Sequence, residues 1–288
     1  APGCNSSSVQ QYVIAALLKT AQEYGFSLKD KTLGIIGVGN VGSKVERFGK
    51  LMGMNVLLND PPRARKEGRK DFVNLSDLLR ASDIVTLHVP LNVVGRDSTY
   101  HMLDEKRLAK IKKGALLLNT SRGEVIETNA LKKALSEGWL KGAVIDVWEN
   151  EPDIDTGLLS LVNTATPHIA GYSTDGKANG TSKIVNSLCE FFKLPLKDWY
   201  PPDVPAPSSP VITIECAGKT DEDIIREAVF HSYDISIDDS DLRSDPSMFE
   251  KLRGDYSIRR EFPAYSIKLV SGTDHVSGIL KSMGFKIL

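Results

Sequence analysis

Cysteine is scarce in this sequence, and its three copies, Cys4, Cys189 and Cys216, lie far apart. None belongs to a C-x-x-C pair, and an odd number of cysteines cannot all pair within one chain. This pattern argues against a disulfide framework and against a zinc site, and it favours a reducing compartment. We therefore expect a cytoplasmic protein without a bound metal.

A surplus of charge of either sign is also lacking. The chain of 288 residues carries 36 basic and 37 acidic side chains, a formal net charge of −1. No global positive field would attract nucleic acid or an anionic membrane, so neither is an expected partner. An anionic substrate would have to be held by local basic groups.

Long apolar runs are missing as well. The longest are short, such as Val13 to Leu18, well below the ~20 residues that span a bilayer. No basic stretch leads into a long apolar core in the chain's first residues, so we expect no signal peptide. We expect no membrane association.

What the sequence does contain is a series of short apolar segments that alternate with amphipathic ones. A helix is expected from the Asn5 to Ser8 cap region to Gly25, and another over 129–140. Strand-like segments lie within 31–42, 55–60, 77–91, 114–121, 141–149 and 161–168. Compact strands separated by helices indicate an α/β fold with a doubly wound parallel sheet of the Rossmann type.

The amino-acid composition changes after a helix that we expect over about 175–193. Residues 194–210 contain six prolines, which disfavour both helices and sheet ladders, so we interpret them as a linker. Strand-like segments at 211–216 and 264–270 and a helix at 221–235 follow. They predict a small C-terminal α+β domain.

Three glycines stand between the first strand and the next helix, in the sequence GVGNVG. Gly37 permits the turn, Gly39 lets a pyrophosphate approach the backbone, and Gly42 lets helix and strand pack closely. Asp60 ends the second strand, where a carboxylate would bind the ribose hydroxyls and repel a 2′-phosphate. This pattern predicts NAD as cofactor, although Arg63 nearby would suit NADP.

Proton-handling side chains follow the later strands. Arg122 follows the fourth strand, Glu151 the fifth and His168 the sixth. Oxidation of a 2-hydroxy acid needs an imidazole to take the hydroxyl proton, a carboxylate to orient it, and a guanidinium to clamp the substrate carboxylate. Glu149 is a local rival of Glu151. The alternative interpretations are a surface ion pair for Arg122, a turn residue for Glu151 and a polar strand end for His168.

The other histidines carry weaker signals. His88, after the third strand, is assigned mainly to structure near the cofactor. We expect His101, His231 and His275 to lack surroundings comparable to those of His168.

In their order along the chain, GVGNVG, Asp60, HVPL, NTSRG, DVWENEP and TPHIAGY resemble the D-isomer-specific 2-hydroxyacid dehydrogenase family, over about residues 1–193. The resemblance implies that Arg122, Glu151 and His168 are catalytic, with His168 as proton donor, and that Tyr172 touches substrate. It also implies cofactor contacts from Gly37, Gly39, Asn40, Val41, Gly42, Asp60, Val89, Thr120, Ser121, Arg122, Asp146 and Gly171.

The segments APGCN, NDPPRA and FEKLRGDYSIRRE resemble a branch of that family that oxidises 4-phospho-D-erythronate with NAD on the path to pyridoxal phosphate. The resemblance implies a homodimer formed through the C-terminal domain. It divides the chain into a helix entering from a substrate lobe, a dinucleotide-binding domain, a return helix, the linker and the dimerisation domain, at 1–25, 26–170, 171–193, 194–210 and 211–288.

The resemblance implies an N-terminal lobe that closes over the substrate, and we expect this sequence to lack it. Because closure excludes water and orients the reactants, we expect the chain to bind NAD but to turn over slowly. Arg259, Arg260 and Lys177 are candidates to hold a substrate phosphate, whereas a solvated charge pair is the plainer interpretation of the two arginines.

Two other functions fit the same residues. One is oxidation of another 2-hydroxy acid, such as 3-phosphoglycerate or glycerate. The other is a cofactor-sensing interaction module that binds NAD without catalysis. The presence of Arg122, Glu151 and His168 together favours an enzyme, because a protein that only binds NAD needs no proton relay.

Overall fold

The computed structural model describes residues 1–68 and 70–288, which form two compact units. The large unit comprises Ala16–Ile169 and Ser236–Asp255. The small unit comprises Ala1–Ala15, Ala170–Ile235 and Tyr256–Leu288. Two helices, α1 (Ser6–Tyr24) and α10 (Ile235–Ser244), run across the boundaries between these segments.

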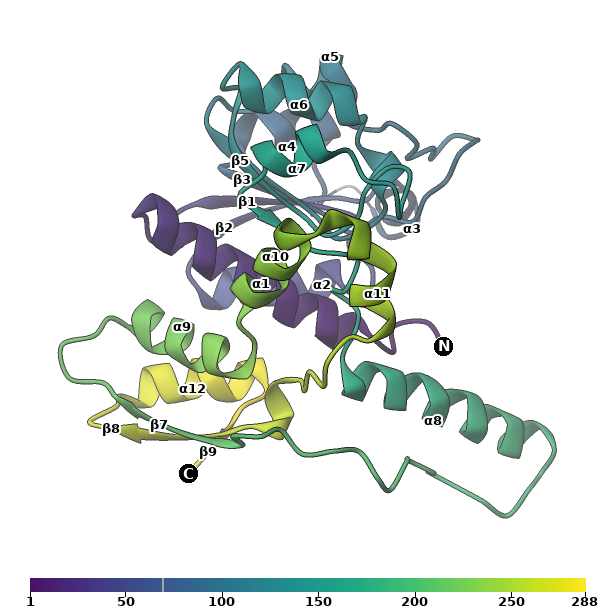
Figure 1. Cartoon of the computed structure of the whole chain (residues 1–288), viewed down its shortest axis with the longest axis vertical. Helices are drawn as coiled ribbons and strands as arrows, with labels where there is room; N and C mark the ends of the chain where they lie inside the picture. Colours follow the sequence, from purple (N-terminus) through teal and green to yellow (C-terminus); the bar gives the residue numbers. More distant parts are fainter. Residues whose placement is uncertain (69) are drawn as a thin grey trace. The chain divides into compact units, whose positions relative to one another are not determined.

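A six-stranded parallel sheet lies at the centre of the large unit (Figure 1). Its strands are β1 (Thr32–Ile36), β2 (Asn55–Asn59), β3 (Ile84–Leu87), β4 (Ala115–Asn119), β5 (Leu140–Ile145) and β6 (Thr164–Ala165). They are arranged in the order β2-β1-β3-β4-β5-β6. The chain therefore changes direction across the sheet between β1 and β3, where such sheets bind ligands.

Helices connect these strands. They are α2 (Gly42–Leu51), α3 (Pro61–Glu67), α4 (Leu75–Ala81), α5 (Glu105–Leu108), α6 (Thr128–Ser136) and α7 (Thr156–Leu161). Helices α4, α5, α6 and α7 form one layer on the sheet, with α2 on the other face (Figure 1). All residues of β3 and β4 are buried, as expected for strands covered on both faces.

This arrangement confirms the predicted doubly wound parallel sheet. Five of the six strands lie inside the expected segments or within one residue of them, but the expected segment 161–168 contributes only the two residues of β6. The rest of that segment forms the end of α7 and the turn that leads to His168. Among the described residues, no helix is both long enough and apolar enough to cross a membrane.

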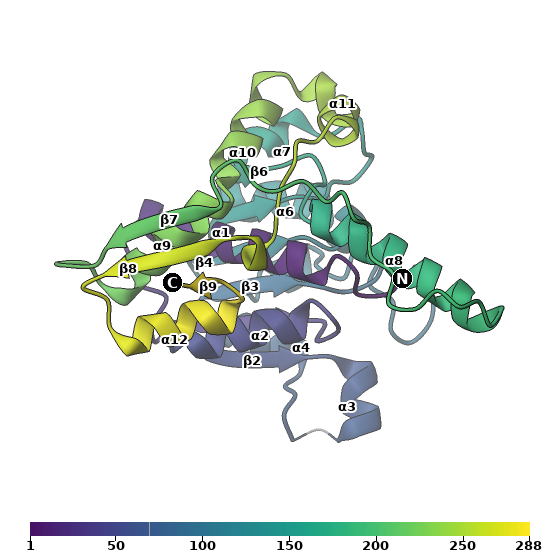
Figure 2. The same cartoon turned by 90° about the horizontal axis from the view of Figure 1, so that it is seen from below.

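The small unit has a sheet of its own, in the order β7-β8-β9 (Figure 2). Its strands are β7 (Val211–Glu215), β8 (Ser266–Val270) and β9 (Lys286–Ile287), and all of them are parallel. Helices α9 (Asp221–Ser232) and α12 (Asp274–Met283) lie together on one side of it (Figure 1). Helix α8 (Thr174–Phe191) precedes residues 194–210, which form no helix or strand.

Three further short helices belong to the C-terminal third. They are α10, which begins at the last residue of the small-unit segment, and a 3-10 turn at Pro246–Met248 and α11 (Phe249–Gly254), which both lie within the part of the chain that returns to the large unit. Leu242 and Phe249 are fully buried in the core of that unit. The sequence did not predict that Ser236–Asp255 belongs to the large unit, because no linker separates this segment from the small unit.

Candidate active site

The glycine turn after β1 is tightly packed at two of its three glycines. Gly37 has a left-handed φ of +88°, and a Cβ there would lie 2.5 Å from the carbonyl oxygen of His88. A Cβ on Gly42 would lie 2.0 Å from the carbonyl oxygen of Gly37, whereas one on Gly39 would meet nothing within 4 Å. The fold therefore requires two glycines, and the third leaves an open approach to the backbone.

The backbone that follows Gly39 suits an anion. Gly39 and Asn40 are exposed, Val41 is half-buried, and α2 begins at Gly42. Helix N-termini carry unsatisfied N–H groups and a partial positive charge, which bind phosphate. An open backbone at the start of a ten-residue helix fits the pyrophosphate of a dinucleotide.

Asp60 is held rigidly beside this turn. One carboxylate oxygen accepts a hydrogen bond from the Val38 N–H at 2.9 Å, and the other accepts from the Arg63 N–H at 3.0 Å and caps α3. Arg63 is occupied by a two-point bond to Glu67, at 2.9 and 2.7 Å, and this bond raises the pKa of its guanidinium. A carboxylate at this strand end favours NAD over NADP.

The ends of β3 and β4 meet next to the turn. The ring of His88 contacts the Thr86 hydroxyl at 3.0 Å and the Thr120 hydroxyl at 3.3 Å. Burial lowers the pKa of His88 from 6.5 to about 3, so the ring is neutral at physiological pH. This agrees with the structural role expected of His88.

Replacing His88 with asparagine should make the protein less sensitive to acid. The unfolded chain binds a proton at His88 below pH 6.5, whereas the folded chain does not until about pH 3. Stability is therefore lost as the pH falls between these values, by ~2 kcal/mol at pH 5. Urea unfolding of parent and variant at pH 8 and pH 5 measures the difference, and an equal acid loss in both would contradict it.

His168 and Glu151 form a hydrogen-bonded pair after β6 and β5. The Nδ1 atom of His168 lies 2.7 Å from Oε2 of Glu151, and the other carboxylate oxygen accepts from the Trp148 N–H at 2.9 Å. The side chains are 26% and 19% exposed, so the pair is sheltered but reachable. Because Glu151 binds Nδ1, Nε2 is the ring nitrogen of His168 that the pair does not use.

Asp146 holds the turn that carries His168. It is 1% exposed, and its Oδ1 accepts from the Ile169 N–H at 2.8 Å and the Thr166 hydroxyl at 2.7 Å. Its carbonyl oxygen accepts from the His168 N–H at 2.7 Å. These bonds stabilise the left-handed φ of +57° at His168, a conformation that is unfavourable for a residue other than glycine. A cofactor contact of Asp146 stays a prediction.

Arg122 projects from the end of β4. It is exposed and forms no ion pair with any residue in 1–68 or 70–288, and its Nη1 donates to the Ser121 carbonyl at 2.6 Å. A Cβ on Gly123 would lie 1.9 Å from the Trp148 backbone. The segment that carries Arg122 is therefore packed against the loop that carries Glu151, and the surface ion pair considered for Arg122 is not formed.

The structure also shows a second histidine–carboxylate pair, which the sequence analysis missed. Glu149 binds His101 at 2.6 Å and accepts from the Thr128 N–H at 2.7 Å. Burial would raise the pKa of Glu149, but the bonds from Thr128 and His101 outweigh it and lower that pKa. Glu149 is thus not the partner of His168, and the view that His101 lacks comparable surroundings was wrong. In the sequence, only the presence of two glutamates on one loop, Glu149 and Glu151, could have indicated a second histidine partner.

Val89, in the large unit, is half-buried next to Gly37. Two other predicted residues lie in the small unit, where Gly171 packs near Asn5 and Tyr172 lies edge-on to Tyr256. Lys177 lies over the Tyr172 ring at 5.2 Å. Roles for Gly171 and Tyr172 toward cofactor and substrate stay predictions.

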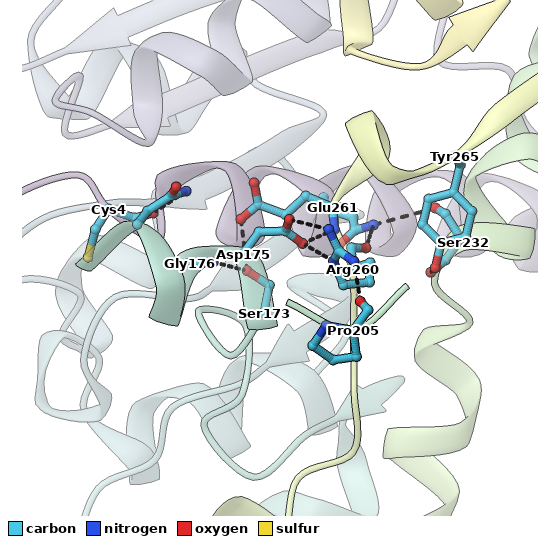
Figure 3. A network of polar contacts seen from close by, with 11 residues as sticks. Cys4, Ser173, Asp175, Gly176, Pro205, Ser232, Arg260, Glu261 and Tyr265 are labelled. Atoms are coloured by element: carbon cyan, nitrogen blue, oxygen red, sulfur yellow. Dashed lines mark hydrogen bonds and ion pairs between the residues drawn. The ribbon is translucent and has the colours of Figure 1, made fainter. Parts of the chain in front are cut away.

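Arg259 and Arg260 are not the solvated pair considered above. Arg259 is 4% exposed and donates to the Ala170 carbonyl at 2.6 Å. Arg260 binds Asp175 at 2.9 and 3.0 Å in the network of Figure 3, in which Glu261 accepts from the Ser173 hydroxyl. These bonds tie the C-terminal segment to the start of α8.

Comparison with known proteins places this geometry in a family. Residues 6–170 match the model of the D-isomer specific 2-hydroxyacid dehydrogenase NAD binding domain, and residues 206–283 match a domain of unknown function. An erythronate-4-phosphate dehydrogenase of Bacteroides fragilis is 48% identical, over 93% of this chain and 74% of the relative. One from Proteus mirabilis is 41% identical, over 99% and 76%.

Solved structures share the fold. A Staphylococcus aureus NAD-dependent formate dehydrogenase in complex with NAD is 25% identical with a TM-score of 0.58, over 68% of this chain and 65% of that one. An Aquifex aeolicus D-lactate dehydrogenase complexed with NAD and lactic acid is 28% identical with a TM-score of 0.52, over 65% and 66%.

The fold, the glycine turn and the histidine–carboxylate pair define an NAD-dependent dehydrogenase of the 2-hydroxyacid class. The cofactor is NAD. The chain belongs to the D-isomer specific 2-hydroxyacid dehydrogenase family, and within it to the group of the erythronate-4-phosphate dehydrogenases.

Proposed function

We propose that this chain oxidises 4-phospho-D-erythronate to 2-oxo-3-hydroxy-4-phosphobutanoate with NAD, as a step toward pyridoxal phosphate. The substrate is supported by relatives of that name, which match 93–99% of this chain. The observation that carries the chemistry is the 2.7 Å bond between His168 and Glu151 at the ends of strands in a dinucleotide-binding sheet.

The cofactor would be held by the turn at Gly37, Gly39 and Gly42, with Asp60 on the adenosine ribose. The open space over Gly39 fits a pyrophosphate. Contacts from Asn40, Val41, Val89, Thr120, Ser121, Arg122, Asp146 and Gly171 are part of the same proposal. When bound, NAD supplies the hydride acceptor for C2 of the substrate.

Three side chains would then handle the substrate. His168 takes the C2 hydroxyl proton through Nε2 and becomes an imidazolium. Glu151, bonded to Nδ1, fixes the tautomer and stabilises that positive charge. Arg122, with its exposed guanidinium, clamps the substrate carboxylate at two points. Tyr172 is proposed to contact the substrate as well.

Comparison of three acids tests the substrate. With NAD in excess, 4-phospho-D-erythronate should give a kcat/KM at least ~10-fold above that of 3-phosphoglycerate or D-glycerate, because a site built to bind a group rejects analogues that lack it. NADH absorbance follows each reaction. A higher kcat/KM for either other acid would replace the proposed substrate and leave the enzyme class unchanged.

A homodimer through residues 211–288 and a cytoplasmic location belong to the same proposal. The small sheet carries α9 and α12 on one side, and Val211 and Leu288 on its strands and end are 53% and 70% exposed. Parallel sheets are normally covered on both faces, which supports a second copy there. Light scattering that gives the mass of one chain at all concentrations would contradict the dimer. The location is supported by three free cysteines, as in a reducing compartment.

A further inference from the structure

We propose that residues Ser236–Asp255, here called the latch, fix the edge strand that leads to His168, and that Asp239 and Arg243 are positioning residues for the reaction. The inference rests on the proposed proton relay. It assigns a catalytic consequence to part of a region that matches only a domain of unknown function, residues 206–283.

The first observation is a pair of side chains one turn apart on α10. The Nε atom of Arg243 donates to Oδ1 of Asp239 at 2.8 Å, and the same oxygen accepts from the Ala165 N–H at 2.7 Å. Strand β6, which contains Ala165, is the last strand of the sheet. Edge strands present N–H groups that no neighbouring strand can accept, and Asp239 accepts one of them.

Arg243 completes the contact on the preceding segment. Its Nη1 donates to the Leu159 carbonyl and its Nη2 to the Val162 carbonyl, each at 2.8 Å. These carbonyls lie at the C-terminal end of α7, where helical partners run out and a cation is favourable. The two side chains thus bind the backbone on both sides of the short connection between α7 and β6.

The second observation is packing. Leu242 and Phe249 of the latch are fully buried, in the same apolar cluster as Trp148, Leu158 and Ala165. Trp148 gives the N–H that Glu151 accepts, and its indole Nε1 donates to the Thr166 carbonyl at 3.0 Å. The latch therefore packs into the cluster that supports both members of the relay.

The third observation is the short path from Ala165 to His168. Thr166 bonds Asp146 through its hydroxyl at 2.7 Å and Ile145 through its N–H at 3.0 Å. His168 follows two residues later in a left-handed conformation, with φ +57°. Such a conformation persists only where its surroundings impose it. A shift of β6 would move His168 away from Glu151, which lies on a different strand end.

A merely structural latch would make the same contacts. It would stabilise the large unit, and its loss would lower the unfolding free energy without altering the His168–Glu151 pair. A positioning role predicts, in addition, a fall in kcat without a matching change in NAD binding, and a change in how the His168 ring titrates.

The test compares Asp239→Ala, Asp239→Asn and Glu250→Ala in the full chain. Asp239→Ala should lower kcat by ~10-fold, because sub-ångström displacement of a catalytic group has effects of this size, with NAD affinity within ~2-fold of the parent. Asp239→Asn keeps an acceptor oxygen for the Ala165 N–H and should restore most of kcat. Glu250, in the latch but 64% exposed and paired with Arg253, is the control whose loss should change neither quantity.

The titration of the His168 ring, followed by NMR, gives a readout that needs no substrate. In Asp239→Ala the midpoint should shift toward that of Glu151→Gln, because the ring loses its 2.7 Å bond to that carboxylate. An unchanged midpoint and kcat in a folded Asp239→Ala would overturn the proposal. If that variant does not fold, Arg243→Lys, which keeps the charge and loses the two-carbonyl fork, should show the same shifts in smaller measure. An unshifted midpoint there would overturn it equally.

The same design separates the two proposals. A parent chain that oxidises none of the acids would refute the proposed function, whereas the His168 titration would still decide whether the latch positions the ring.

Discussion

Replacing His168 with alanine is expected to lower kcat by about 10²- to 10⁴-fold while leaving the affinity for NAD within ~2-fold of the parent. The ring is bonded to Glu151 at 2.7 Å, and its Nε2 atom is the group that would take the substrate proton. Its removal takes away the general base without touching the glycine turn. NADH formation measures the rate, and fluorescence titration with NADH measures binding.

His101→Ala is the matched control for this prediction. His101 also pairs with a carboxylate of the same loop, Glu149, at 2.6 Å, but it is not assigned to the proton relay. Its loss should change kcat by less than ~3-fold. If His168→Ala kept the parent rate, His168 would not be the general base of this enzyme, and the proposed relay through Glu151 would be refuted.

Gly39→Ala is expected to weaken NAD binding without loss of stability, whereas Gly42→Ala is expected to destabilise the fold. A methyl group on Gly39 meets no protein atom within 4 Å, so the unfolding free energy should stay within ~0.5 kcal/mol of the parent. The methyl group would stand where the pyrophosphate approaches, and the Kd for NAD should rise at least ~10-fold, or about 1.4 kcal/mol.

Gly42→Ala would instead place a carbon 2.0 Å from the Gly37 carbonyl oxygen. The start of α2 would have to move away from β1, at a cost of about 3 kcal/mol. Urea unfolding and NAD titration of both variants measure the two effects. Unchanged NAD affinity in Gly39→Ala would show that the cofactor does not cross this turn.

Much of the large unit could be predicted from local pattern. Buried parallel strands appear as short apolar runs, and the turn after β1 requires glycine at Gly37 and Gly42 because a Cβ would clash with backbone. These signals are contained in a few consecutive residues. The sheet, the NAD turn and the strand ends that carry Arg122, Glu151 and His168 were therefore predictable.

Pairings between individual side chains were harder to predict from the sequence. Glu149 and Glu151 stand two residues apart on one loop and are chemically alike, yet they face different histidines. The loop geometry after β5, with a left-handed φ of +62° at Asn150, decides which carboxylate faces which ring. Sequence spacing alone left Glu149 as a rival and gave no partner to His101.

By itself the sequence determined the class of fold, the glycine turn and the candidate residues for proton transfer, because each depends on backbone rules that act over short distances. Only the tertiary structure decided that Asp239 and Arg243 bind the edge of the sheet beside β6, more than 70 residues away from them in the chain. Contacts of that separation arise from folding as a whole and leave no periodic mark in the sequence.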